Sequence, residues 1–306
     1  MLWESIRDRY KKATRIPQQL SPIIELVSSL SLLQNASSGS YTCILGCLIP
    51  EELLFTFEEK GIPSSNVTIV PVTDPQLGNH VDSKFPAKPP GSLPILAIPQ
   101  YNHGANVIYI RQSLAIMSYL NELCDNGAEG FPDSRYSMRG ADALEHAHIN
   151  GVIALADECT TQWNAIRLFS TGAGPFPLPD ASNEMLRWVR RSLMTIEAAY
   201  NDRDLAPLIQ SETDESATNN SVNLPDVVLY QFLEFTVDCY GVDMTQRSGK
   251  VVKDVYGRDV LEKFPKLVEF YNAFKTRISV IRDAEQGEVP PSTVLEKMKN
   301  WHKESP

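Results

Sequence analysis

The pattern of hydrophobic and polar positions predicts strands and helices in the first half of the chain. The apolar run YTCILGCL, residues 41–48, is typical of a buried strand, and Pro50 suits the first turn of a helix because its missing N–H needs no partner there. The next stretch, PEELLFTFEEKG, has apolar residues on one face, acids at its start and Gly61 at its end. With the β-branched run NVTIVPV, this opening predicts the order strand, helix, strand.

A second pair of strands and a helix follow a polar, proline-rich passage. The apolar runs GSLPILAIP and NVIYI are separated by QYNHGA, which has the composition of a hairpin loop. The stretch RQSLAIMSYLNELC then repeats its apolar residues at helical spacing. These elements together predict a small α/β domain.

The strand-like pattern largely ends after Cys124, and long helical patterns take its place. The acidic, turn-rich stretch DNGAEGFPDSR is typical of a linker. Four helices are predicted, at residues 135–170, 183–200, 226–240 and 265–283. The predicted organisation is a helical N-terminal extension (1–38), an α/β domain (39–126), a linker (127–134), an all-helical domain (135–290) and a C-terminal tail (291–306).

Composition and charge narrow the class of protein. A chain of 306 residues with 42% hydrophobic and 22% charged residues is long enough for two globular domains. The net charge of −10, without a long basic cluster, argues against nucleic acid and anionic membranes as partners. Five scattered cysteines favour a reducing compartment, and no apolar run approaches the roughly 18 residues of a membrane span, so we expect a cytoplasmic protein.

The two cysteines of the first predicted strand and the turn after it, Cys43 and Cys47, are the first candidates for chemistry. Three residues separate them, so the CxxC redox motif is absent. His146 and His148 do not share a helical face and lack the HExxH spacing, so we expect no metal site. A nucleophile at a strand-to-helix turn and a pair of buried thiols both remain open at this point.

Two further motifs carry a resemblance to a known family. The stretches KPPGSLPIL and IRQSLAIMSYL resemble the glutathione-binding half of the cytosolic glutathione transferases. The residues at the family's P-x-G-x-V-P and E/Q-S-x-A-I positions are Pro89, Gly91, Leu93, Pro94, Gln112, Ser113, Ala115 and Ile116. NLPDVVLYQFLEF resembles the family's capping box, with Asn223 as the N-cap and Asp226 three residues later. The resemblance covers about residues 41 to 285 and implies a thioredoxin-like N-terminal domain followed by an all-α C-terminal domain.

The resemblance also implies glutathione as the bound cosubstrate. A cis bond before Pro94 would turn the backbone of Leu93 toward a ligand's peptide group. Ser113, at the start of a helix, can offer its hydroxyl and N–H to a carboxylate, with the amide of Gln112 beside it. Lys88 and Ser92 belong to the same segment and are expected to bind glutathione as well.

The family stabilises the glutathione thiolate with a Tyr, Ser or Cys near the end of the first strand or the start of the first helix. Cys47 falls where the Ser and Cys classes have this residue, whereas Tyr41 and Cys43 fall near the Tyr-class position. A free thiol has a pKa near 8.5, so a hydrogen-bond donor and a helix N-terminus raise the nucleophilic fraction at neutral pH. Glu51 and Glu52 follow closely and would oppose ionisation of a thiol there.

The resemblance predicts an enzyme that conjugates glutathione to a small hydrophobic electrophile, or uses it to isomerise one. We expect the electrophile in a cleft between the domains, lined by Tyr136, Trp163 and Arg167. By resemblance, the protein would be a homodimer. The alternative is a non-catalytic relative that serves as a ligand-binding or protein-interaction module.

Overall fold

A computed structural model describes most of the chain. The described residues are 41–45, 51–71, 89–91, 93–99, 107–128, 130–132, 136–171, 176–209, 222–246, 249–280 and 292–304. The predicted N-terminal extension, the QYNHGA loop and three predicted site residues, Cys47, Lys88 and Ser92, lie outside the described residues. The chain divides into two compact units, Met1–Ser137 and Met138–Pro306.

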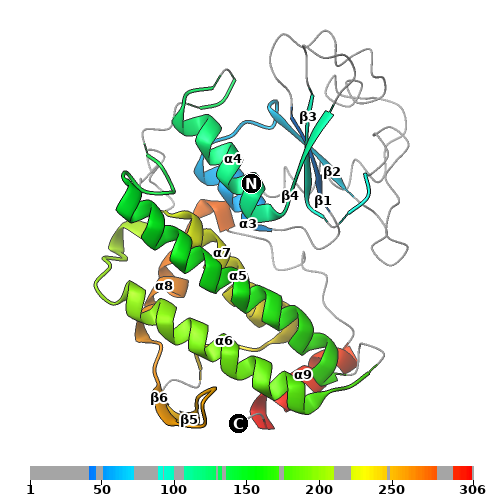
Figure 1. Ribbon diagram of the computed structural model, residues 1–306, viewed down its shortest axis with the longest axis vertical. Coiled ribbons are helices and arrows are strands. Elements are labelled where there is room, and N and C mark those ends of the chain that lie inside the picture. Colours follow the sequence, from blue (N-terminus) through cyan, green and yellow to red (C-terminus); the bar gives the residue numbers. More distant parts are fainter. Residues whose placement is uncertain are drawn as a thin grey trace. The chain divides into compact units, whose positions relative to one another are not determined.

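The first unit contains a four-stranded sheet and two helices, in the predicted order. The elements are β1 (Tyr41–Leu45), α3 (Glu51–Glu59), β2 (Val67–Pro71), β3 (Ile95–Pro99), β4 (Val107–Arg111) and α4 (Ser113–Asp125). The strand order is β2-β1-β3-β4; β1 is parallel to β2, and β3 is antiparallel to both of its neighbours. Both helices lie on one side of the sheet (Figure 1). This arrangement confirms the predicted thioredoxin-like domain.

A buried lysine ties the ends of α3 and α4 together. Helix α3 is followed by Gly61, whose φ of 62° is the left-handed conformation that glycine adopts readily at a helix end. The ammonium of Lys60 lies 2.9 Å from the carboxylate of Asp125, and it donates a hydrogen bond of 2.7 Å to the carbonyl oxygen of Tyr136. This ion pair fixes the position of α4, and therefore of the residues at its start.

The second unit is a bundle of helices with a continuous core. Its helices are α5 (Ala143–Thr171), α6 (Pro179–Tyr200), η1 (Ala206–Leu208), α7 (Leu224–Tyr240), α8 (Pro265–Phe274), η2 (Ile278–Val280) and α9 (Ser292–Glu304). Helices α5 and α6 lie side by side along most of their length, and α7 packs against α5 (Figure 1). Fully buried side chains such as Leu193, Leu229 and Phe270 form the core. No helix among the described residues is long and apolar enough to cross a membrane.

Two helices of this unit are shorter than the sequence predicts. Helix α5 starts at Ala143, because the carboxylate of Asp142 accepts hydrogen bonds from the backbone N–H groups of Leu144 and Glu145, at 2.8 and 2.9 Å. The same bonds lower the pKa of Asp142. Helix α8 ends at Phe274 and does not extend through the whole predicted range.

Helix α7 begins with the predicted capping box. The backbone N–H of Asn223 donates to the carboxylate of Asp226 at 2.7 Å. Asp226 is fully buried and also accepts hydrogen bonds from the Tyr200 hydroxyl and the Arg203 guanidinium. The cap therefore links α7 to the end of α6.

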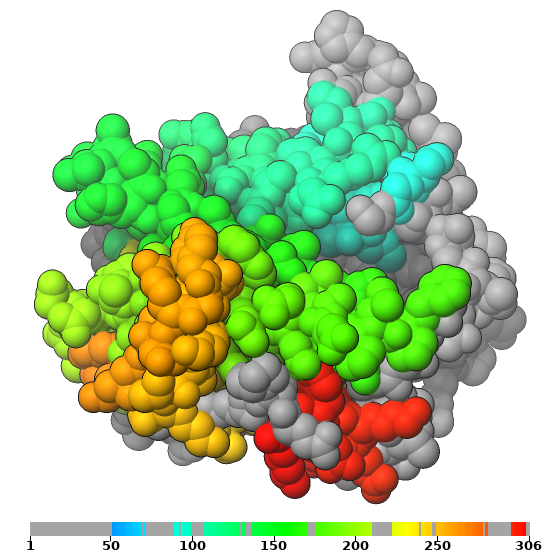
Figure 2. Space-filling view, turned by 60° about the horizontal axis from the view of Figure 1, so that its bottom comes forward, coloured from blue at the N-terminus to red at the C-terminus, as the bar shows by residue number. Residues whose placement is uncertain are grey.

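The prediction of a purely helical second domain is incomplete, because the unit also contains a β-hairpin. Strands β5 (Lys250–Lys253) and β6 (Asp259–Glu262) pair in antiparallel register. The hairpin lies on the surface, as Figure 2 shows in orange, with Val251 65% and Leu261 47% exposed. The hairpin was not predicted, because its short strands have apolar residues on both faces of the hairpin and therefore show little of the alternation typical of a strand.

The predicted C-terminal tail contains a helix that packs on the second unit. Helix α9, red in Figure 2, contacts α5 and α7. Met298 is fully buried, and the indole N–H of Trp301 donates to the side-chain oxygen of Asn183 at 3.1 Å. The end of the chain therefore contributes to the core of this unit.

Candidate functional site

The pairing of β3 with β4 brings the two predicted glutathione-binding motifs together. Ile95 lies opposite Arg111 in the antiparallel register. Leu93 stands two residues before Ile95, and Ser113 stands two residues after Arg111, so both lie at the end of the strand pair where α4 begins. The Leu93–Pro94 peptide bond is cis, as the motif suggested, and Leu93 is half-buried. Two segments about twenty residues apart therefore meet at one edge of the sheet.

The backbone of Gln112 has an unusual conformation at this edge. Its φ of 72° and ψ of 130° make it the one non-glycine residue with positive φ among the described residues. Such a conformation costs about 1–3 kcal/mol and is found mainly where the surrounding structure or a ligand requires it. Ser113 follows as the half-buried first residue of the 13-residue helix α4. The unpaired N–H groups and the dipole at the start of α4 favour an anion beside Ser113.

Arg111 is a residue of this edge to which the sequence analysis gave no role. Its guanidinium donates a hydrogen bond of 2.8 Å to the carbonyl oxygen of Pro90. The side chain also crosses Gly91, whose φ is 124°, so a Cβ at Gly91 would stand 2.9 Å from the Arg111 Nε. Arg111 therefore holds the segment before Leu93 against the end of β4. Its position directly before the Gln112 motif was the one available signal in the sequence.

Strand β1 ends at the same edge of the sheet. Ile44 lies opposite Ile95, so the chain leaves β1 close to the start of β3. Cys47 follows the last residue of β1 by two positions in the sequence, outside the described residues. Cys43 pairs with Leu96 nearer the middle of the sheet, and Tyr41 is the first residue of the strand, at its far end. This topology favours Cys47 over Tyr41, although the roles of all three remain predictions.

Two other cysteines are buried thiols with free side chains. Burial raises the pKa of Cys124 to about 11, with Lys60 lowering it and Asp125 raising it further. In the second unit, burial raises the pKa of Cys159, whose thiol lies 3.8 Å from the carbonyl oxygen of Val189. Both thiols are therefore protonated at neutral pH, and neither is suited to act as a nucleophile.

The three predicted cleft residues belong to different units. Tyr136 is half-buried near the end of the first unit. Trp163, on α5, is fully buried, with its ring edge-on to Tyr240 at 5.6 Å between centroids. Arg167, one turn later, donates to the Tyr240 hydroxyl at 3.0 Å and lies 5.7 Å from the centroid of the Phe235 ring. The burial of Trp163 is typical of a core residue, and the role of all three at a substrate site remains a prediction.

Solved structures with the same arrangement of elements identify the fold. A glutathione transferase from Methylobacillus flagellatus with bound glutathione aligns with a TM-score of 0.50 and 19% identity, over 79% of this chain and 97% of its own. Ure2p in complex with glutathione aligns with a TM-score of 0.53 and 14% identity, over 88% and 97%. The glutathione transferase URE2P6 from Phanerochaete chrysosporium, in complex with oxidised glutathione, aligns with a TM-score of 0.52 and 15% identity, over 86% and 98%.

This chain has the glutathione transferase fold. The predicted fold class is thereby confirmed, and the likeness covers nearly the whole length of each of these three proteins. At identities of 14 to 19%, it concerns the fold and not the chemistry. No protein-family model and no curated protein sequence matches the chain.

Proposed function

We propose that this protein binds glutathione at the edge formed by Leu93, Pro94, Gln112 and Ser113. The observation that carries the proposal is the β3–β4 register, which pairs Ile95 with Arg111 and so brings Leu93 and Ser113 to the same end of the strand pair. The backbone of Leu93 would pair with the ligand's peptide group, while the Ser113 hydroxyl and N–H would donate to its γ-glutamyl carboxylate. Glutathione bound to three proteins of the same fold supports this choice of ligand.

Glutathione affinity, measured by calorimetry, tests this binding site. Ser113→Ala removes a donor to a carboxylate, and a hydrogen bond to a charged group contributes about 1.5–3 kcal/mol, so we expect roughly 10- to 150-fold weaker binding. Ser118→Ala is the matched control, because Ser118 is also half-buried on α4 but lies more than one turn from the edge. No binding at millimolar glutathione, or equal affinities for the two variants, would refute the proposal.

We further propose that Cys47 acts on the bound cosubstrate. In conjugation, the glutathione thiol loses its proton to water and its sulfur attacks an electrophilic carbon. A C–S bond forms while either a leaving group departs with its bonding electrons or a carbon–carbon π bond opens and takes up a proton. In isomerisation, the sulfur adds to a double bond, and the C–S bond later breaks as the double bond re-forms and the thiolate leaves. If the protein acts on glutathione disulfide, the Cys47 thiolate attacks one sulfur, forms a mixed disulfide and releases a glutathione thiolate. Of the three predicted cleft residues, Tyr136 and the partly exposed Arg167 are proposed to contact the electrophile, whereas the complete burial of Trp163 favours a place in the core.

Substitutions at the start of the first unit test the assignment of Cys47. Cys47→Ser is expected to abolish mixed-disulfide formation and to change the rate of conjugation, whereas Tyr41→Phe is expected to leave both unchanged. Mass spectrometry after incubation with glutathione disulfide measures the first reaction, and the change in absorbance of an electrophile measures the second. Intact activity in Cys47→Ser combined with its loss in Tyr41→Phe would overturn the assignment.

A second candidate function, glutathione binding without turnover, is favoured by the acidic start of α3. Glu51 and Glu52 occupy the first turn of α3, and the side chain of Glu52 is buried. Negative charge close to a thiol disfavours the thiolate, so acids that follow Cys47 in the sequence would lower its reactive fraction. Under this alternative, the chain binds glutathione normally but turns over no electrophile, and Glu51→Gln with Glu52→Gln raises the thiol's reactivity without changing affinity.

A further inference from the structure

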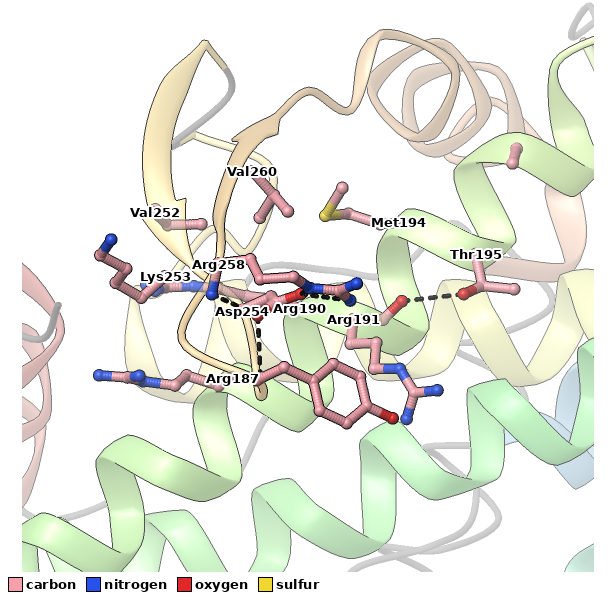
Figure 3. Close-up of a pocket in the computed structure, with 12 residues that line it drawn as sticks. Arg187, Arg190, Arg191, Met194, Thr195, Val252, Lys253, Asp254, Arg258 and Val260 are labelled. Atoms are coloured by element: carbon pink, nitrogen blue, oxygen red, sulfur yellow. Dashed lines mark hydrogen bonds and ion pairs between the residues drawn. The ribbon is translucent and has the colours of Figure 1, made fainter.

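A groove in the second unit lies between helix α6 and the β5–β6 hairpin, remote in sequence from the proposed glutathione site. Its cavity has a volume of about 360 Å³, a size found among small-molecule sites. One wall is a face of α6 that includes Arg187, Arg191 and Met194, and the hairpin forms the other wall. Figure 3 shows side chains from both elements around this groove.

The inner surface of the groove is apolar. Val252 and Val260 lie opposite one another in the hairpin register, and both line the groove. Met194 and Ala198, four residues apart and so on the same face of α6, complete this surface. A flat hydrocarbon body could therefore be removed from water here.

Positive charge gathers around this apolar surface. Five cations and one carboxylate line the groove: Arg187, Arg190, Arg191, Lys253, Arg258 and Asp254. The chain as a whole has a net charge of −10, so this cluster does not follow from its composition. Cations held close together repel one another and raise the local concentration of anions. The groove is thus suited to a ligand that carries more than one negative charge.

Four of the five cations have an acidic partner, and the exposed ones among them keep part of their charged group in contact with solvent. Arg190 is buried and lies 3.5 Å from Glu262, which is fully buried, so this pair joins α6 to the hairpin. Arg187 pairs with Glu184 at 3.6 Å, and Lys253 pairs with Asp259 at 2.7 Å. Arg258 donates through two nitrogens to Asp254, at 2.8 and 2.9 Å, but its side chain is 70% exposed, so part of its guanidinium stays in contact with solvent. The exposed guanidinium groups therefore remain accessible to a ligand.

Arg191 is the cation best placed to bind such a ligand. No carboxylate among the described residues is within ion-pair distance of it, and its guanidinium lies 5.1 Å from the centroid of the Trp188 ring and 5.8 Å from that of Tyr256. Both rings are exposed, at 39% and 65%. These contacts hold the guanidinium at the mouth of the groove by cation–π attraction, without neutralising its charge.

We propose that this groove binds a small organic phosphate with an aromatic body. The body would lie on Met194, Val252 and Val260, and the phosphate dianion would bind the guanidinium groups of Arg191 and Arg258. A guanidinium presents parallel N–H donors that match two oxygens of a phosphate, which a lysine ammonium does not. The cluster consists mostly of arginines, and this favours a phosphate over a monovalent carboxylate.

Calorimetric titration of the full chain with 1-naphthyl phosphate tests the proposal. We expect one bound molecule per chain, with an affinity that falls as salt is added. Inorganic phosphate, which has the head group alone, and 1-naphthol, which has the body alone, are each expected to bind at least tenfold more weakly. Absence of binding at millimolar 1-naphthyl phosphate would overturn the proposal, as would equal affinity for inorganic phosphate or for 1-naphthol.

Variants locate the bound molecule. Arg191→Gln, and separately Arg258→Gln, should weaken binding of 1-naphthyl phosphate at least tenfold; both side chains are exposed, so the fold should tolerate the change. Ala198→Phe fills the apolar surface without changing any charge and should weaken binding to the same extent.

Lys275→Gln is the matched control, because Lys275 is an exposed cation 5.5 Å from the centroid of the Tyr271 ring, in the same unit but outside the groove. An unchanged affinity in Arg191→Gln, or an equal loss in Lys275→Gln, would refute the proposed site.

Discussion

Replacing Asp226 with alanine should destabilise the second unit more than any exposed aspartate replacement. The fully buried Asp226 carboxylate caps α7 at the backbone N–H of Asn223 and accepts hydrogen bonds from Tyr200 and Arg203. Burial, followed by the charge of Asp226, raises the pKa of the Tyr200 hydroxyl, which therefore stays protonated as a donor. Removing the carboxylate leaves all three donors without this acceptor.

The magnitude follows from the two roles of the carboxylate. Loss of a capping side chain costs about 1 kcal/mol, and removing one partner of a buried ion pair costs about 3–5 kcal/mol. Because the same oxygens serve both roles, the two losses overlap, and we expect a total near 3–5 kcal/mol. For a unit of this size, 1 kcal/mol shifts the melting temperature by about 2–4 °C, so the expected decrease is roughly 6–20 °C.

Circular dichroism at 222 nm during thermal and urea unfolding measures this effect. Asp259→Ala is the matched control, because Asp259 is 65% exposed and pairs with the exposed Lys253 at 2.7 Å. An exposed pair contributes about 0–1 kcal/mol, so the control should unfold within a few degrees of the unchanged protein. Asp226→Asn keeps an acceptor oxygen and should fall between the two. Equal melting temperatures for Asp226→Ala and Asp259→Ala would refute this reasoning.

Three further predictions concern Gly91, Cys124 and Met298. Gly91→Ala should weaken glutathione binding and lower the free energy of unfolding by about 1–3 kcal/mol, because Gly91 has a φ of 124° and a Cβ there meets Arg111. Adding Arg111→Ala should restore part of both losses, as measured by calorimetry and by denaturation. Complete restoration would exclude backbone strain at Gly91. Cys124 should react far more slowly with iodoacetamide at pH 8 in the folded than in the urea-unfolded chain, and rapid alkylation of the folded chain would contradict this. Because its folded pKa of about 11 exceeds the free value near 8.5, its contribution to stability should be lost as pH rises from about 8.5 towards 11. Met298→Ala should lower the stability of the second unit by about 2–5 kcal/mol in urea unfolding, because Met298 is fully buried, while no change would show that α9 is dispensable for the core.

Much of the candidate site could be predicted from the sequence because its motifs are local. The cis bond before Pro94 and the start of α4 at Ser113 depend on residues within a few positions of each other. The role of Arg111 was not predicted, because its partner Pro90 lies in another segment of the chain. A single hydrogen bond between distant segments produces no periodic pattern of residues in the sequence. The end of β1 lies beside the start of β3 because these two strands pair, and short apolar strands do not specify that pairing by themselves.

By itself, the sequence determined the order of strands and helices in the first unit, the two motifs proposed to bind glutathione, and the capping box at Asn223 and Asp226. These features are encoded by hydrophobic period, by proline and by capping chemistry, all of which act over a few residues. Only the tertiary structure decided the register that brings Leu93 and Ser113 to the same end of the strand pair, and the groove between α6 and the hairpin. Those features join segments about twenty to seventy residues apart, and such contacts form only when burial of the shared core outweighs the entropy of closing the loops between them.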